Sequence, residues 1–274
     1  MRNYKARYIP VLFGAMFVAA MFVATACKKR FPNVETIEVA ATDTSDIIAI
    51  DDSLVVPVDY IHVFPLDKLS TESRKRKFID IMLPSILVTR FQLVQLRDRV
   101  LDIERLDSLE RSHDQMQLID TLLVKYKSQD IEELSEKLIP HPPSIALAQA
   151  ALECAWGTSR FFYEANNPFG IWSFFGDEPR ISSLQPRDGS QVYLRKYSSL
   201  KESVENYYFV ISTGPYKEFR EKRLSSSDPF ELIPYLYNYS EMRSAYVEMV
   251  RDIIRQNNLE KYDNYQIEPD YIRD

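Results

Sequence analysis

The chain has 274 residues, 45% hydrophobic and 27% charged, which is the composition of a globular protein with one well-buried domain plus appendages. Its formal net charge of −6 at pH 7 argues against nucleic acid as a ligand. Six glycines argue against glycine-rich phosphate-binding loops, while 17 tyrosines and 15 phenylalanines favour aromatic walls around a core or a groove. The two cysteines are too few for a disulfide framework.

The N-terminus is typical of an export signal. Basic residues precede an uncharged run, residues 8–26, which ends in small residues just before Cys27. Residues 24–27 resemble a bacterial lipoprotein signal, so that residues 1–27 form the export signal and Cys27 would carry the lipid and become the first mature residue after cleavage just before it. An uncleaved membrane anchor and simple secretion remain the alternatives, because the run is long enough to cross a bilayer. All three place the rest of the chain outside the cytoplasm. The expected location is the cell envelope, tethered to a membrane on the non-cytoplasmic side as a periplasmic or outer-membrane lipoprotein.

Residues 28–72 are predicted to be an acidic spacer. Eight acidic residues and no Lys or Arg lie between positions 31 and 67. Like charges favour an extended chain, which would hold a catalytic domain clear of the lipid surface. The short apolar segments 47–50 and 54–58 leave open a second possibility, that part of this region docks as a strand.

Helical periodicity dominates the next part of the chain. It runs through residues 73–101, 103–126 and 131–138. Pro84 is expected to kink or split the first of these helices. After two prolines, Ser144 can cap a further helix that extends to Trp156, with Gly157 as its stop.

Turn residues and an alternating segment predict a small β-hairpin lobe between residues 170 and 200. Helical spacing returns at 200–212, 229–237 and 244–256, and a polar tail follows at 264–274. The predicted fold class is α+β, predominantly α, with one domain at residues 73–263.

Glu153 is the main candidate for chemistry, because it is the one carboxylate in an otherwise uncharged helix. Helical spacing predicts that Gln149 and Trp156 are its neighbours, and no cation is among them. A buried carboxyl without a counter-charge has a raised pKa, which a general acid working near neutral pH needs. The alternative is a structural residue at a helix end, paired with Arg160.

Two other kinds of site find little support. Cys154 could act as a nucleophile with His141 or His113, but no surrounding motif favours this over a packed thiol. The three histidines, His62, His113 and His141, lack the spacing of metal ligands. We therefore predict no metal and no cofactor.

Two sequence blocks resemble the bacterial glucosaminidase family, glycoside hydrolase family 73, and in particular its Bax-like branch. The first is Ala-Gln-Ala-Ala-Leu-Glu-Cys-Ala-Trp-Gly-Thr-Ser-Arg-Phe at 148–161, and the second is Asn-Asn-Pro-Phe-Gly-Ile-Trp at 166–172. Weaker similarity continues through 195–208 and 239–259. Two departures from the family pattern are Cys154-Ala155, where Ser-Gly is usual, and Pro168, where Leu is commoner.

The resemblance implies a lysozyme-like fold and endo-β-N-acetylglucosaminidase activity on peptidoglycan. It also implies that Glu153 is the general acid and that Tyr239 assists at the sugar. Glycosidic cleavage ordinarily uses a second carboxyl group. The hairpin lobe offers Asp177, Glu178 and Asp188, of which we favour Glu178; the N-acetyl group of the substrate could also take this role.

Peptidoglycan glycan strands are the expected partner, besides the membrane reached through the N-terminal lipid or anchor. The residues expected to contact the sugar are mainly aromatic or amide side chains: Gln149, Trp156, Asn167, Phe169, Trp172 and Tyr246. Asn167, with Asn166, is also expected to hold the turn after the catalytic helix. A catalytically idle wall-binding module and an amidase acting on the peptide stem remain as alternative functions.

The lipoprotein interpretation is testable in cells. Labelled fatty acid should be incorporated into the wild-type chain and not into Cys27→Ala, because the thiol is the attachment point. Equal labelling of the two chains would contradict lipidation and leave an ordinary anchor or secretion signal.

Overall fold

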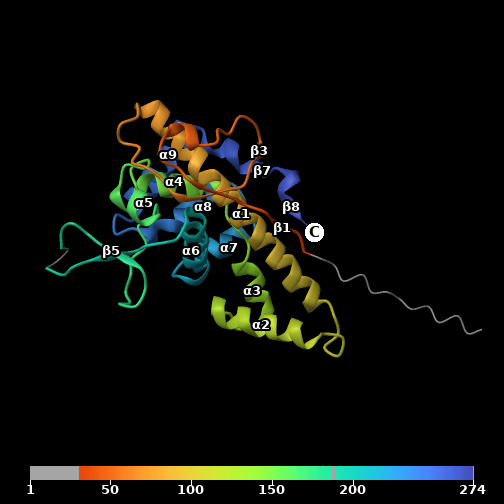
Figure 1. The fold of residues 1–274 in the computed structure, drawn as a ribbon. Coiled ribbons are helices and arrows are strands. Elements are labelled where there is room, and N and C mark those ends of the chain that lie inside the picture. The colour runs from red at the N-terminus through yellow and green to blue at the C-terminus, as the bar shows by residue number, and fades with distance from the viewer. Residues whose placement is uncertain (1–30, 187–188, 274) are drawn as a thin grey trace, which may run out of the picture. The chain divides into compact units, whose positions relative to one another are not determined.

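The computed structural model describes residues 31–186 and 189–273, and residues 31–274 form one compact unit (Figure 1). The predicted export signal with Cys27 lies outside the described residues, as does Asp188. The described part is mainly helical with small two-stranded sheets, which confirms the predicted fold class.

Helix α1 (Thr71–Glu104) is the longest element, and the other helices pack along it. The Ser70 hydroxyl caps its first turn by accepting from the Ser73 backbone N–H. Pro84 lies inside the helix and does not split it. Residues 78–89 are buried without interruption and are mostly apolar, because this stretch is the centre of the domain. Among the described residues, α1 is the one helix long and apolar enough to cross a membrane, and its burial explains that composition.

Helix α4 (Pro143–Glu153) lies in the core between α1 and α9 (Ser244–Asn257). Its residues from Pro143 to Ala151 are all buried. Alanines at four of these positions let the neighbouring helices approach closely. Helix α6 (Leu200–Thr213) packs on α1 as well. The catalytic candidate Glu153 is thus the last residue of a helix that is buried up to Ala151.

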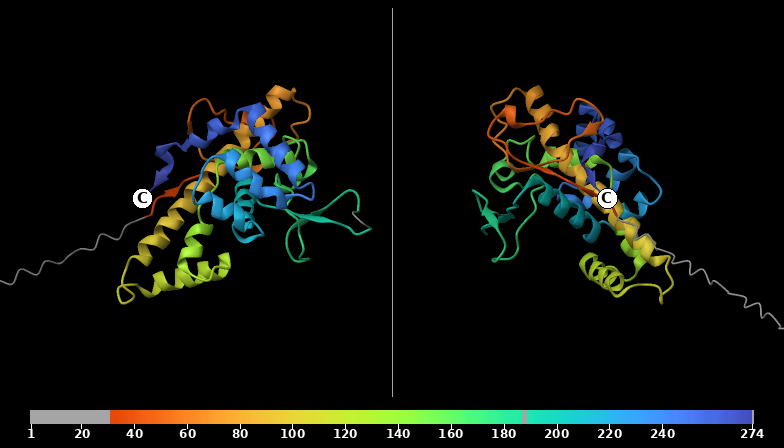
Figure 2. Two further views of the ribbon diagram at one scale, coloured as in Figure 1. Left: turned by 180° about the vertical axis from the view of Figure 1, so that it is seen from behind. Right: turned by 45° about the vertical axis from the view of Figure 1, so that its right-hand side comes forward.

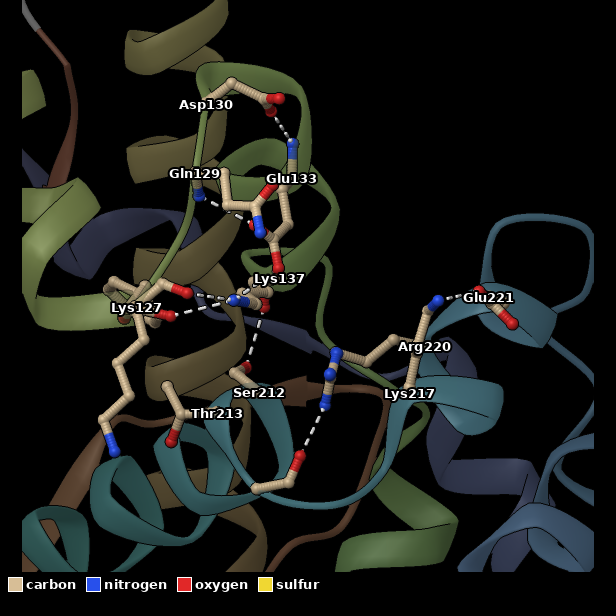
Figure 3. Close-up of polar contacts among 12 residues, drawn as sticks. Lys127, Gln129, Asp130, Glu133, Lys137, Ser212, Thr213, Lys217, Arg220 and Glu221 are labelled. Atoms are coloured by element: carbon tan, nitrogen blue, oxygen red, sulfur yellow. Dashed lines mark hydrogen bonds and ion pairs between the residues drawn. The ribbon is translucent and has the colours of Figure 1, made fainter.

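A satellite cluster joins the end of α1 to α2 (His113–Tyr126) and α3 (Ile131–Lys137). At its centre the buried Lys137 ammonium donates to the backbone oxygens of Tyr126 and Lys127 and pairs with Glu133 at 2.8 Å (Figure 3). The Ser212 hydroxyl of α6 donates to the Lys137 carbonyl at 2.7 Å. These bonds fix α3, and with it the start of α4, against α6.

The predicted hairpin lobe is confirmed. Strand β5 (Arg180–Ser182) pairs antiparallel with β6 (Tyr193–Arg195), and Trp172 forms a further bridge to Leu194. The lobe extends from the helices in both views of Figure 2. The remaining helical elements are short: η1 (Thr44–Asp46), α5 (Arg160–Ala165), α7 (Lys217–Arg223), α8 (Pro229–Leu232), η2 (Ile233–Tyr239), η3 (Leu259–Asn264) and η4 (Pro269–Tyr271).

The spacer prediction is wrong for residues 31–70, which are part of the folded unit. Three strand pairs tie this region to itself and to the predicted polar tail: β1 (Asn33–Val34) with β8 (Ile272–Arg273), β2 (Ile37–Ala40) with β4 (Val58–His62), and β3 (Leu54–Val55) with β7 (Gln266–Ile267). Most of its acidic residues are exposed, whereas Asp59 of β4 is buried. Side chains such as Tyr60, Val63 and Leu66 are fully buried. The structure shows that the apolar segment 54–58 docks on the domain, which was the second possibility for this region.

A strained turn follows α4. The helix ends at Glu153 and not at Trp156 as predicted, because Ala155, Trp156 and Gly157 all have positive φ, at 50°, 57° and 82°. A Cβ at Gly157 would lie 2.7 Å from Leu66, so glycine is required there for space as well as conformation. The resembled family usually has glycine at the position of Ala155. The left-handed backbone there explains this preference, because glycine adopts that conformation without strain.

Burial in β4 predicts a large contribution of residues 31–67 to stability. Tyr60→Ala should lower the free energy of unfolding by about 3–5 kcal/mol, because a fully buried aromatic ring is lost. Its neighbour Ile61 is 39% exposed, and Ile61→Ala should cost within about 1 kcal/mol. Urea denaturation measures both. Equal, small effects would mean that this strand is not packed on the domain.

The strain at Ala155 predicts a stabilising substitution. Ala155→Gly should raise the free energy of unfolding by about 0.5–1 kcal/mol, since relief of the left-handed conformation outweighs the extra freedom of glycine in the unfolded chain. The control is Ala151→Gly in buried α4, which should destabilise by about 1 kcal/mol or more. A loss of stability in Ala155→Gly would contradict the strain.

Candidate active site

Glu153 lies at the C-terminal end of α4 in a recessed position. The residue is exposed to solvent, yet protein surrounds its carboxyl group closely enough that burial raises the pKa, against a lowering effect of hydrogen bonding by the Tyr246 hydroxyl. The carboxylate also faces the negative end of the helix dipole, which opposes ionisation further. These influences favour the protonated acid.

The loop after α5 approaches this carboxyl group directly. A Cβ at Gly170 would lie 3.7 Å from the Glu153 Oε2 atom, and Gly170 itself has a φ of +64°. Upstream, the Asn167 amide donates to the carbonyl oxygens of Ile171 and Arg195, and its oxygen accepts from the Ile171 N–H. The buried Asn167 therefore holds the loop against the acid, as expected of a turn residue.

Three tyrosines enclose Glu153 on the other sides. Burial, and after it the charge of the Glu153 carboxylate or neighbouring tyrosines, raises the pKa of Tyr239 and Tyr246 well above the ordinary value, and that of Tyr216 to about 12. The Tyr239 and Tyr246 rings stack with centroids 5.4 Å apart, and Tyr216 lies 6.3 Å from Tyr239. The raised pKa values keep all three hydroxyls protonated and neutral.

The structure thus brings Tyr239 to Glu153, as the sequence predicts. Its hydroxyl donates to the backbone oxygen of Phe169 at 3.3 Å, and the side chain is half-buried. Its catalytic role stays a prediction. Tyr216 is a neighbour of the acid that the sequence pattern did not indicate, because it follows a Gly-Pro pair outside every recognised block.

The proposed sugar contacts need correction. Gln149, Asn167, Phe169 and Tyr246 are at most 2% exposed, so none of them presents a surface to a substrate. Phe169 stacks on Tyr207 with ring centroids 4.0 Å apart. These side chains form the wall behind the acid.

The two tryptophans lie in different surroundings. Trp156 is half-buried against α1, with its ring 5.5 Å from Phe78 and 5.1 Å from the Lys75 ammonium. The helical spacing that predicted it beside Glu153 does not apply, since the helix has already ended. Trp172 is 40% exposed and borders an open depression of about 420 Å³, together with Phe174, Tyr193 and Glu241.

Glu178, the predicted second carboxylate, belongs to the hairpin lobe. It pairs with Arg195 at 3.1 Å and accepts from the Phe175 N–H at 3.4 Å. Its slight burial would raise the pKa, but hydrogen bonding by Ser173 and the charge of Arg195 lower it on balance. Glu178 is therefore an ionised carboxylate, and its role at the sugar stays a prediction.

The structure also bears on the alternatives for this region. Arg160 pairs with Glu164 at 2.9 Å and not with Glu153, so the capping interpretation is wrong. Burial raises the pKa of the Cys154 thiol to about 12, and His141 bonds to Tyr207, which argues against a Cys–His nucleophile. In the described residues, no three His, Cys, Asp or Glu side chains are placed to hold a metal ion.

Comparison with known proteins finds a matching protein family, a related sequence and several solved structures. Residues 129–259 match the glucosaminidase family, described as mannosyl-glycoprotein endo-β-N-acetylglucosaminidase. The exo-glucosaminidase LytG of Bacillus subtilis (strain 168) is 27% identical over 201 residues, which are 69% of this chain and 68% of that protein.

Solved structures with some similarity include the catalytic domain of the autolysin Auto from Listeria monocytogenes, at 23% identity and a TM-score of 0.39, covering 61% of this chain and 96% of that one. Another is a C-terminally truncated glycoside hydrolase domain of Salmonella typhimurium FlgJ, at 20% identity and a TM-score of 0.36, covering 51% of this chain and 95% of that one. The matched family segment contains Glu153, the loop that faces it and all three tyrosines around it. The chain therefore carries a domain of the glucosaminidase family and is a glycoside hydrolase.

Proposed function

We propose that the domain hydrolyses N-acetylglucosaminidic bonds in the glycan strands of peptidoglycan, with Glu153 as general acid. The observation that carries the proposal is the position of the Glu153 carboxyl, which is recessed at the end of a buried helix among tyrosine hydroxyls, where burial raises its pKa. The glucosaminidase match supports the choice of sugar, and the expected position in the cell envelope supports peptidoglycan as the polymer.

In this mechanism the Glu153 proton passes to the glycosidic oxygen as the bond to the anomeric carbon breaks. The resulting positive charge at the sugar needs a negative or nucleophilic group. Glu178 is ionised and suits that task; the N-acetyl oxygen of the substrate suits it as well. Tyr239 is the side chain best placed to support the sugar beside the acid, since it is half-buried next to Glu153.

The open aromatic depression beside Trp172 supports binding of an extended glycan. Sugar rings stack their apolar faces on aromatic side chains, and Trp172 and Phe174 are 40% and 75% exposed there. An open surface suits attack within a strand, in line with the family description, whereas LytG carries an exo designation. We propose endo cleavage, for which early products from long strands are large fragments and not single sugars or disaccharides.

Tethering to the membrane is a separate part of the proposal. The basic start, the apolar run and Cys27 support an N-terminal lipid or anchor. A tether would keep the enzyme in the envelope, where its substrate is.

Glu153→Gln tests the acid directly. It should lower turnover by about 10²–10⁴-fold, because the amide keeps the shape but cannot give a proton. The matched control is Glu164→Gln, an exposed glutamate paired with Arg160, which should keep activity. Release of new reducing sugar ends from purified peptidoglycan measures both. Binding without products in the wild type would indicate an idle module, new amino ends would indicate an amidase, and full activity in Glu153→Gln would remove the acid assigned here.

The raised pKa of Glu153 also predicts the direction in which activity and stability change with pH. Activity should fall as the pH rises through that pKa, because the proton is lost. Ionising this carboxyl costs folding free energy, so stability should likewise fall between the unfolded and the folded pKa. Glu153→Gln should therefore unfold no more easily than the wild type at neutral pH, by urea denaturation. A destabilised variant would contradict the raised pKa.

A further inference from the structure

A chain of buried hydrogen bonds leads from the far side of the core to the acid. His141 Nε2 lies 2.9 Å from the Tyr207 hydroxyl, which donates to Gln149 Oε1 at 2.6 Å. Gln149 Nε2 donates in turn to the Tyr246 hydroxyl at 2.9 Å. All four side chains are at most 2% exposed. We call this set the relay: His141, Tyr207, Gln149 and Tyr246.

The direction of the relay follows from the number of protons. Tyr207 has one hydroxyl proton and gives it to Gln149, so His141 must be the donor to Tyr207. His141 is neutral, because burial and then the charges of Arg223 and Arg90 hold its pKa well below the ordinary value. Its proton therefore sits on Nε2, and its Nδ1 atom has no hydrogen-bond partner among the described residues.

The near end of the relay faces Glu153. Because the Tyr246 oxygen already accepts from Gln149, its own proton is free to be donated onward. Hydrogen bonding by the Tyr246 hydroxyl lowers the pKa of the Glu153 carboxyl, against the raising effect of burial, which places the two groups within reach of each other. Catalytic hydrogen bonds are often long without substrate and tighten when it binds.

We propose that the relay is a one-way positioning device, which holds the Tyr246 hydroxyl as a donor aimed at Glu153 and thereby sets the acid's orientation and strength. The inference rests on the proposed role of Glu153. None of the four members touches the substrate, so they are positioning residues. Three contribute through helices α4, α6 and α9, which makes the acid sensitive to how these helices pack.

Neutral groups surround Glu153 in the part of the chain that the structure describes. They are the hydroxyls of Tyr216, Tyr239 and Tyr246 and the thiol of Cys154. The formal charges lie at the far end of the relay, where Arg90 and Arg223 flank His141. The Tyr246 hydroxyl is therefore the polar contact that lowers the proton affinity of Glu153 against the effect of burial.

Adjacent tyrosines of α6 provide the test. Tyr207→Phe breaks the relay, so that the Gln149 amide can turn its oxygen toward Tyr246 and take the proton meant for Glu153. Tyr208 is equally buried and its ring stacks on His141. Tyr208→Phe removes a hydroxyl that donates to the His141 backbone oxygen, outside the relay. Each of the two variants loses one tyrosine hydroxyl, at neighbouring positions of α6.

The readout is the pH profile of kcat on purified peptidoglycan with the full chain. In Tyr207→Phe and Tyr246→Phe the basic limb should move upward by about one pH unit, as for a carboxylate that loses a charge-assisted hydrogen bond, with KM unchanged. In Tyr208→Phe the limb should stay in place. The relay would be overturned if the basic limb stayed in place in Tyr207→Phe and Tyr246→Phe, or if it shifted equally in all three variants.

A second measurement separates this inference from the proposed function. Titration of the ¹³C carboxyl signal of Glu153, identified by its absence in Glu153→Gln, reports the proton affinity without any substrate. A wild type that releases no sugar ends overturns the proposed function, while the carboxyl titration still decides the relay. Should Tyr207→Phe not fold, Tyr246→Phe carries the same expectation.

Discussion

The enclosure of α4 is the constraint on which the rest of the structure depends. Small side chains let α1 and α9 close on this helix, so its backbone leaves the core only at its C-terminal end. Glu153 occupies that end, where the surrounding protein and the helix dipole both disfavour its negative charge. The helix must then turn away within four residues, which explains three successive left-handed conformations at positions 155–157. The raised pKa of Glu153 and the strained backbone at positions 155–157 thus both follow from the enclosure of α4.

Much of the helical domain could be predicted from the sequence, because long amphipathic segments carry a strong local signal. The acid was predictable for the same reason, as the one carboxylate in an apolar helix. Trp156 was misplaced because i to i+3 spacing has meaning only while the helix continues. The N-terminal strands were missed because each has only two to five residues and its partner lies far along the chain or is equally short. Acidic side chains on their exposed positions made the region look like a spacer.

The wall behind the acid shows a different limit of sequence reasoning. Gln149 and Tyr246 stand in recognised blocks and were taken for sugar contacts, but both side chains point into the core. A polar side chain near a catalytic residue can bind the substrate or position the catalytic residue, and the sequence pattern is the same in both cases. Only burial and hydrogen-bond partners distinguish them. His141 and Tyr207 gave no local signal at all, since they reach Gln149 from other elements.

The pairing of β1 with β8 and of β3 with β7 has a consequence for how the domain folds. Asn33 is matched with Arg273, and Leu54 with Gln266, so two of the three strand pairs of this region close loops of nearly the whole domain. Contacts of such large sequence separation form late, because the entropy of closing the loop must be overcome before they contribute. The helical core can therefore assemble first, and the N-terminal segment is sealed by the last residues of the domain. Pairing of the two ends is therefore expected to be among the last steps of folding.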